Sequence, residues 1–179
     1  MDFRLYYPPF LLGLSRLIDA LLALGGFAIL TLVFANATLR SVAGFDLAWS
    51  LEVTAFLLLW TTFLGCAAVT ARGAQMRVTE IVDILFSPRA KALLEHAINL
   101  LIAALLLSLI IKGISISGHT WRQSTTVLYW PVGLLYASMP AGMALSLMFH
   151  LFNSWLFLRG VPMTDGGGAL SFFSLSRSF

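Results

Sequence analysis

Charged residues and cysteine are both scarce in this sequence. Asp, Glu, Lys and Arg make up 11% of its 179 residues, whereas hydrophobic residues make up 59% and the mean hydropathy is +0.91. Because soluble domains carry about 25% charged residues, this chain cannot cover a water-facing surface and must face mostly lipid or other membrane protein. The single cysteine, Cys66, excludes an internal disulfide and a CxxC pair. Its apolar surroundings predict a small packing residue.

The residues that catalysis or cofactor binding would need are also missing. Of the three histidines, His96 and His119 lie near predicted helix ends and His150 stands alone in the last apolar run. Haem would need paired histidines, a metal several grouped ligands, and a membrane serine protease a serine beside a base. We therefore expect no enzyme and no cofactor in this chain, and a local packing or hydrogen-bonding role for each histidine. The dispersed basic residues argue against nucleic-acid binding.

Four apolar runs are each about long enough to cross a bilayer. A helix needs about 20 residues to span roughly 30 Å of hydrocarbon, and within lipid the backbone groups must hydrogen-bond inside the helix. The runs predict an all-α integral membrane protein with four transmembrane helices, at about 17–40, 49–71, 90–117 and 131–158. Pro140 is expected to kink the last helix. Residues 1–159 would form a single membrane domain.

The segment between the second and third spans has a helical spacing of its own. Its apolar residues recur at i, i+3, i+4, i+7 and i+8 and its polar residues lie opposite, which predicts a short interfacial amphipathic helix at about 77–86. An irregular loop is the alternative. The apolar positions are Val78, Ile81, Val82, Leu85 and Phe86. After the fourth span, the glycines and serines of residues 160–179 predict a flexible cytoplasmic tail.

The distribution of Lys and Arg predicts the orientation. With four spans, both termini share one side of the membrane with the loop between the second and third spans. Eight of the 11 Lys and Arg residues fall on that side: Arg4, Arg16, Arg72, Arg77, Arg89, Lys91, Arg159 and Arg177. Since basic residues favour the cytoplasm, both termini are expected there.

Small residues recur along two of the spans. Gly133, Ala137 and Ala141 follow one another every four residues in the fourth span, and Gly65 lies on a similar face of the second. Small faces let membrane helices approach closely. Packing within the chain and an interface with a partner protein both fit this pattern.

Three segments resemble one family of membrane proteins. The first runs from Arg40 to Trp49 and Glu52, the second continues from Trp60 through Gly65 to Arg72, and the third is Thr125-Thr-Val-Leu-Tyr-Trp-Pro131 followed by Tyr136 and Pro140. Their order and spacing resemble the small, DctQ-like membrane subunit of tripartite ATP-independent periplasmic (TRAP) transporters, over about residues 15–158. The chain departs from the family at 75–79, where His-Ile-x-Val-Asp is common, and at Thr125, where serine is common.

The resemblance implies partners and a role. Such small subunits lie in the bacterial inner membrane, in contact with phospholipid. They pair with a large multi-span subunit that holds the sodium and substrate sites and moves as an elevator, while a periplasmic substrate-binding protein delivers an organic acid, often a carboxylate or sialic acid. The small subunit would brace the static part of its partner. A stand-alone small carrier or channel and an accessory subunit of a membrane enzyme are the alternatives.

The family resemblance also suggests roles for several residues at the predicted outer face. Arg40 and Glu52 would form a pair that ties the first span to the second, or would be two separately solvated charges. Pro131 and Tyr136 would fix the start of the fourth span, since proline is common in a first helical turn.

Overall fold

The fold is all-helical, as predicted. The computed structural model describes residues 7–73 and 88–158, and the helices in this part of the chain are α1 (Pro9–Ala43), α2 (Ala48–Arg72), α4 (Pro88–Thr120), α5 (Val132–Tyr136) and α6 (Ser138–Leu158). They supply four segments that are long and apolar enough to cross a membrane. The predicted interfacial helix at 77–86 and the predicted tail at 160–179 lie outside the described residues.

Proline and glycine set the limits of the first two helices. α1 starts at Pro9, eight residues before the predicted span, because proline fits a first helical turn. It ends where Gly44 takes a left-handed φ of 63°. Gly73 ends α2 in the same way with a φ of 67°. At about 1.5 Å per residue, the 35 residues of α1 extend well beyond roughly 30 Å of hydrocarbon.

The predicted fourth span is divided into two helices. α5 ends at Tyr136 and α6 begins at Ser138, with Ala137 between them. The cause is Pro140, which has no amide hydrogen and whose ring clashes with the carbonyl four residues earlier. That carbonyl belongs to Tyr136, so the helix breaks one turn before the proline. The predicted kink is therefore a short interruption placed earlier than Pro140 itself.

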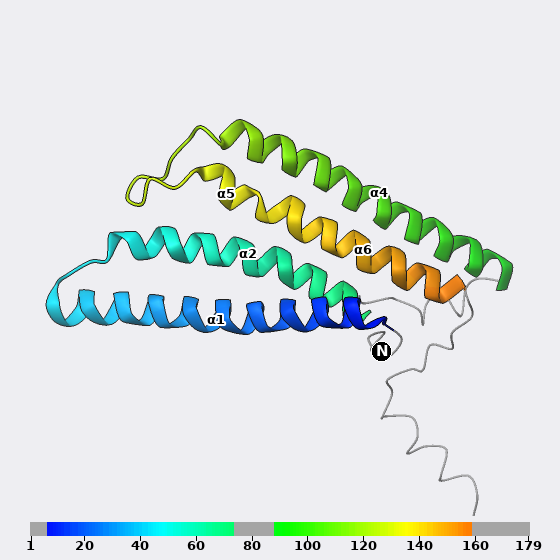
Figure 1. The fold of residues 1–179 in the computed structure, drawn as a ribbon, viewed down its shortest axis with the longest axis horizontal. Coiled ribbons are helices and arrows are strands. Elements are labelled where there is room, and N and C mark those ends of the chain that lie inside the picture. The colour runs from blue at the N-terminus through cyan, green and yellow to red at the C-terminus, as the bar shows by residue number, and fades with distance from the viewer. Residues whose placement is uncertain (1–6, 74–87, 159–179) are drawn as a thin grey trace, which may run out of the picture.

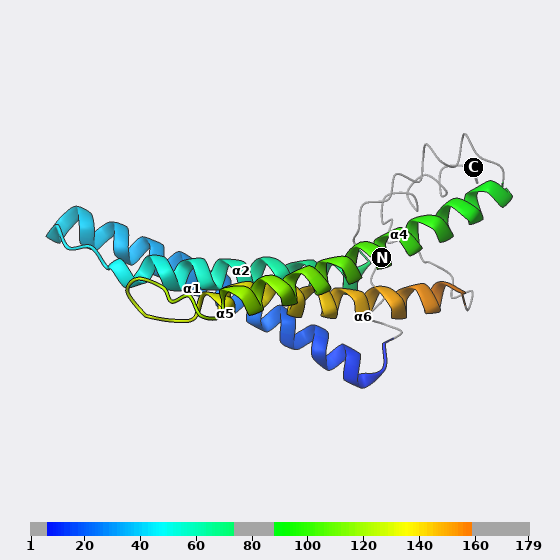
Figure 2. The same cartoon turned by 90° about the horizontal axis from the view of Figure 1, so that it is seen from above.

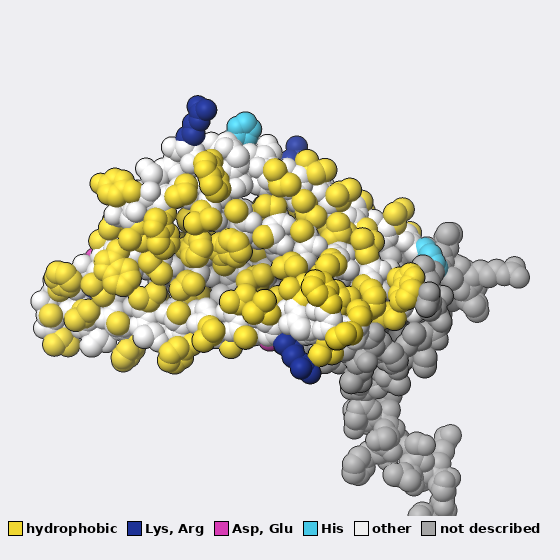
Figure 3. Space-filling model, in the orientation of Figure 1, with side chains coloured by type: hydrophobic (Ala, Val, Ile, Leu, Met, Phe, Trp, Pro, Cys, Tyr) yellow, Lys and Arg dark blue, Asp and Glu magenta, His cyan; other side chains and the backbone are white. Residues whose placement is uncertain are grey.

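The helices lie side by side in one layer (Figures 1 and 2). α2 packs between α1 and α6, and α6 packs between α2 and α4. Figure 2 shows that α1 crosses this layer at an angle. A single layer encloses few side chains. In the most apolar stretch of each span, 11% of the residues of α1 and 6% of those of α4 are buried, against 33% in the span formed by α5 and α6. Most apolar side chains are thus left on the outside, and Figure 3 shows them over one broad face.

The main cluster of buried apolar side chains lies where α1, α2 and α6 meet near Tyr7. Phe149 is completely buried and Ile18 is 2% exposed. Ala67 and Ala71 of α2 are also completely buried, so small side chains let the neighbouring helices close on α2. Cys66, predicted to be a packing residue, is exposed instead, because successive helical side chains point about 100° apart and Ala67 and Ala71 take the inward positions.

Candidate functional site

The carboxylate of Glu52 joins the start of α2 to the loop between α4 and α5. Its two oxygens accept hydrogen bonds from the backbone amides of Val127 and Leu128, at 2.8 and 2.9 Å. Glu52 lies in the first of the three segments that carry the family resemblance, and the loop belongs to the third. The fold therefore brings two segments that are about 75 residues apart into one contact.

The loop that meets Glu52 is folded back on itself. Ser124 and Pro131 form an isolated antiparallel bridge. Between them the amide of Thr125 donates to the carbonyl of Trp130 at 2.8 Å, and the amide of Trp130 donates to the Thr125 hydroxyl at 3.1 Å. Tyr129 completes the turn with a positive φ of 55°. These bonds leave the two amides at the tip free to bind the carboxylate.

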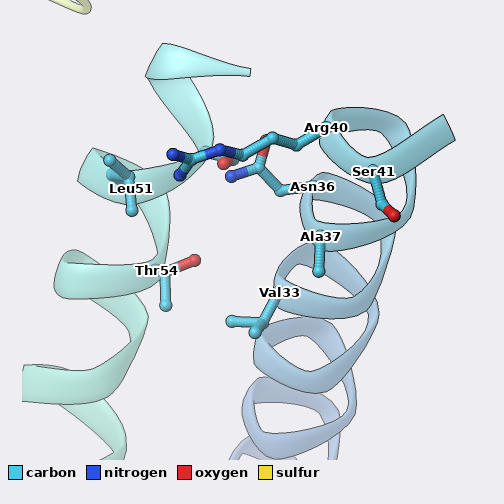
Figure 4. A pocket seen from close by; sticks show the side chains of 8 residues that line it. Val33, Asn36, Ala37, Arg40, Ser41, Leu51 and Thr54 are labelled. Atoms are coloured by element: carbon cyan, nitrogen blue, oxygen red, sulfur yellow. The ribbon is translucent and has the colours of Figure 1, made fainter. Parts of the chain in front are cut away.

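Arg40 and Glu52 do not form the predicted pair. No ion pair joins them in the described part of the chain, because the Glu52 carboxylate is occupied by the loop amides. Arg40 instead lines a pocket of about 570 Å³ between α1 and α2 (Figure 4). What ties the two helices together here is Asn36, whose side-chain oxygen accepts the amide hydrogen of Leu47 at 2.9 Å.

Gly133 makes a close contact within the chain, between α5 and the end of α4. A Cβ atom there would lie 2.6 Å from the carbonyl oxygen of Ser117 and 2.7 Å from the ring of Trp121. The Ser117 hydroxyl also donates to the Gly133 carbonyl at 2.8 Å. Glycine at this position therefore lets α5 pack directly on the end of α4. Ala137 lies at the break between α5 and α6. Ala141 is half-buried, and its backbone amide donates to the carbonyl of Ala137 at 3.2 Å.

The other predicted positions are divided between interior and surface. A Cβ atom at Gly65 would lie 4.0 Å, an ordinary contact distance, from the side chain of Leu22 of α1. Pro131 precedes α5 as its N-cap residue, and Pro140 packs on Gly113 of α4. The side chains of Trp49 and Tyr136 lie on the surface, 40% and 41% exposed.

At the other end of the layer, an ion pair joins α1 to α2. Nη2 of Arg72 lies 2.7 Å from Oδ1 of Asp19, and the two side chains are 49% and 27% exposed. Sequence reasoning selected Arg72 and missed its partner, because Asp19 lies 53 residues earlier within an apolar helix. The pair fixes how far α1 and α2 are shifted along one another.

A second polar contact at this end involves Tyr7, which sequence reasoning also missed. Its hydroxyl donates to the side-chain oxygen of Asn153 at 2.6 Å and lies 3.1 Å from the carbonyl of Ala71. The Asn153 amide group in turn donates to the carbonyl of Thr70 at 2.8 Å. The ring of Tyr7 stacks on Phe149 with centroids 5.9 Å apart. These contacts connect the start of α1 with the ends of α2 and α6.

His150 has the local role predicted for it. It is 5% exposed, and its Nε2 lies 3.1 Å from the carbonyl oxygen of Asn99 in α4, to which it donates. Among the described residues, no three histidine, cysteine or carboxylate side chains come together as a metal site. The polar side chains of the helices bind helices and loops to one another.

The geometry first defines a class: a multi-pass helical membrane protein in which buried polar groups connect one layer of helices. Residues 29–160, a range that includes all three resembling segments, match the family described as tripartite ATP-independent periplasmic transporters, DctQ component. The chain belongs to this family and is a small membrane subunit of a TRAP transporter. The family consists of transporter subunits, not enzymes, and membership implies association with a large membrane subunit and a substrate-binding protein. No curated protein matches the chain.

Proposed function

We propose that this subunit is a fixed brace for the large membrane subunit of a sodium-coupled transporter for organic acids. The observation that carries the proposal is the single layer of helices. A layer has two broad apolar faces, so it can lie against a larger membrane protein with one face and against lipid with the other. The exposed residues of α1 illustrate the available surface, with Phe27, Leu30 and Phe34 each more than 70% exposed.

The internal hydrogen bonds support a static role. Ser117, His150 and Asn153 each bond to a backbone carbonyl of a neighbouring helix. These bonds hold the helices of this chain together as one body, which a brace requires. In this proposal sodium and substrate are bound by the large subunit, and the present chain supplies neither a cofactor nor a metal ligand.

For orientation, we propose that the end carrying Tyr7, Arg72 and Leu158 faces the cytoplasm and that the α4–α5 loop faces the periplasm. The support is the excess of Lys and Arg on the first side. The membrane would then be the bacterial inner membrane. A cysteine introduced at Gln123, in a Cys66→Ala background, should react with a membrane-impermeant maleimide from the periplasm. Protection of this cysteine in intact cells, with labelling only after lysis, would reverse the orientation.

The brace is tested by reconstitution with its partner subunits. The large subunit and the substrate-binding protein should take up substrate into vesicles only when this chain is present, only with an inward sodium gradient, and without ATP. The chain alone should move nothing. Solute transport by the solitary chain would refute the brace and favour an independent carrier.

A second measurement separates a fixed subunit from a moving one. A spin label on native Cys66, which is exposed in the second half of α2, reports distances to a second label on the static part of the large subunit. We expect that distance to stay constant when sodium and substrate are added. A change of several ångströms, as large as that between the two domains of the large subunit, would mean that this chain moves with the substrate.

A further inference from the structure

The pocket between α1 and α2 lies beside the connection between these helices. Its volume is about 570 Å³, within the range of about 300–1,000 Å³ typical of ligand sites. In Figure 4 the Arg40 side chain extends from α1 across the gap toward α2, above Val33 and Thr54. The lining residues are Val33, Asn36, Ala37, Arg40, Ser41, Ser50, Leu51 and Thr54.

The polar groups of this pocket can donate hydrogen bonds that nothing in the described chain accepts. Ser50 is 2% exposed, lines the pocket, and its hydroxyl has no hydrogen-bond partner among the described residues. Arg40 has no carboxylate partner there either, since Glu52 is bonded to the α4–α5 loop. No acidic side chain lines the pocket. The exposed guanidinium of Arg40 and the buried hydroxyl of Ser50 line the same pocket and can both donate, which favours an anion.

The start of α2 adds to this preference. Leu47 is its N-cap residue and supplies no side-chain hydrogen bond, so first-turn amides of α2 are left without a side-chain cap. The N-terminus of a helix carries a partial positive charge and favours anions such as phosphate. The buried Ser50 belongs to this same first turn and lines the pocket, so its hydroxyl and the helix end lie at the same site.

The remaining wall of the pocket is apolar and exposed on the surface of the chain. Val33 and Leu51 are 52% and 64% exposed, and Ala37 lies between Val33 and Arg40 along α1. A small soluble anion would leave this wall unused. The pocket also lies close in sequence to Trp49, an exposed tryptophan of the kind found at lipid headgroup level. A ligand with an anionic head and an apolar tail uses both parts.

We propose that this pocket binds the phosphodiester headgroup of a membrane phospholipid. Arg40, Ser50 and the first turn of α2 hold the phosphate, and one acyl chain lies along Val33 and Leu51. The bound lipid fills the gap between α1 and α2 beyond the Asn36 hydrogen bond and so stiffens the end of the layer. Guanidinium groups suit phosphate because they donate in a fixed fork.

Native mass spectrometry of the purified full chain tests the proposal, with phosphatidylglycerol titrated into the detergent. We expect one retained lipid, and about tenfold weaker retention in Arg40→Gln, in line with the loss of one charge-assisted contact. Arg122→Gln is the matched control, because Arg122 is an exposed cation of the α4–α5 loop outside the pocket. This control should retain lipid like the original chain. Equal retention by both variants, or equal loss, would refute the site.

Further arms identify the source of the phosphate and guard against unfolding. Ser50→Ala should weaken retention less than Arg40→Gln, and Arg40→Lys should restore part of it, with unchanged circular dichroism in all three. Inorganic phosphate in excess should not displace the lipid, because it cannot use the apolar wall; displacement would refute a lipid as the ligand. If Arg40→Gln retained lipid normally but lost the large subunit in pull-downs, the pocket would bind protein and the proposal would be wrong.

Discussion

Gly142 controls how closely α6 packs against α2, and replacing it gives the sharpest test of the layer. A Cβ atom at this position would lie 2.6 Å from both the Cβ and the carbonyl oxygen of Phe63, and 2.7 Å from its carbonyl carbon. Ordinary contacts of a Cβ atom begin near 3.4 Å. Because two of these three atoms belong to the backbone of α2, no side-chain rotation relieves the clash. α2 and α6 must therefore separate locally.

The expected cost follows from two opposing effects. Overpacking of this kind costs about 1–3 kcal/mol, while alanine gains about 0.5–1 kcal/mol over glycine inside a helix. From the middle of these two ranges, Gly142→Ala should lower the free energy of unfolding by about 1.3 kcal/mol. Gly26→Ala is the matched control, since Gly26 lies inside α1 and a Cβ there meets nothing within 4 Å. This variant should be as stable as the original chain or slightly more stable.

The assay is equilibrium unfolding of the purified chain in mixed micelles with a rising fraction of sodium dodecyl sulfate. Helix content is followed by circular dichroism and side-chain packing by tryptophan fluorescence. The predicted loss corresponds to roughly a tenfold shift in the folding equilibrium. If Gly142→Ala were as stable as Gly26→Ala, the close approach of α2 and α6 would be wrong, and with it the order of helices in the layer.

Four further substitutions test three contacts at the two ends of the layer. Glu52→Gln keeps one acceptor but places an NH₂ group against a loop amide, so hydrogen exchange at the tip of the α4–α5 loop should accelerate while exchange in the middle of α6 stays unchanged; unchanged exchange at the tip would contradict the carboxylate contact. Tyr7→Phe leaves the Asn153 oxygen without its donor and should cost about 1–3 kcal/mol in the same micelle assay; a neutral effect would place the hydroxyl elsewhere. Asp19→Arg and Arg72→Asp should each weaken assembly with the large subunit, and the double exchange should restore it; failure of the double variant would show that the two charges act separately.

The helices could be predicted because the membrane imposes them. Long apolar runs with few charges have one solution in lipid, so the spans followed from residue types alone. Pro140 also predicted a kink in the fourth span. The position of the break at Ala137 was harder to predict. It depends on the backbone carbonyl of Tyr136, and the side chains of Tyr136 and Ala137 give no sign of it.

The contacts between helices could not be predicted in the same way. Glu52 binds backbone amides, which every residue except proline possesses, so Val127 and Leu128 gave no signal as its partners. Its opposite charge made Arg40 the expected partner of Glu52. In the structure, Arg40 lines the pocket between α1 and α2 instead. Asp19 and Arg72 have opposite charges, but they are far apart in sequence. Their pairing could be recognised only once the structure showed how α1 and α2 lie against each other.

The contact between Tyr7 and Asn153 has a consequence for how the protein is made. The two residues are 146 positions apart, near opposite ends of the described chain. During synthesis Tyr7 leaves the ribosome long before the residue that receives its hydrogen bond has been translated. The start of α1 can therefore reach its final position only after the last helix has been inserted. The hydrogen bond between Tyr7 and Asn153 therefore belongs to the late steps of folding.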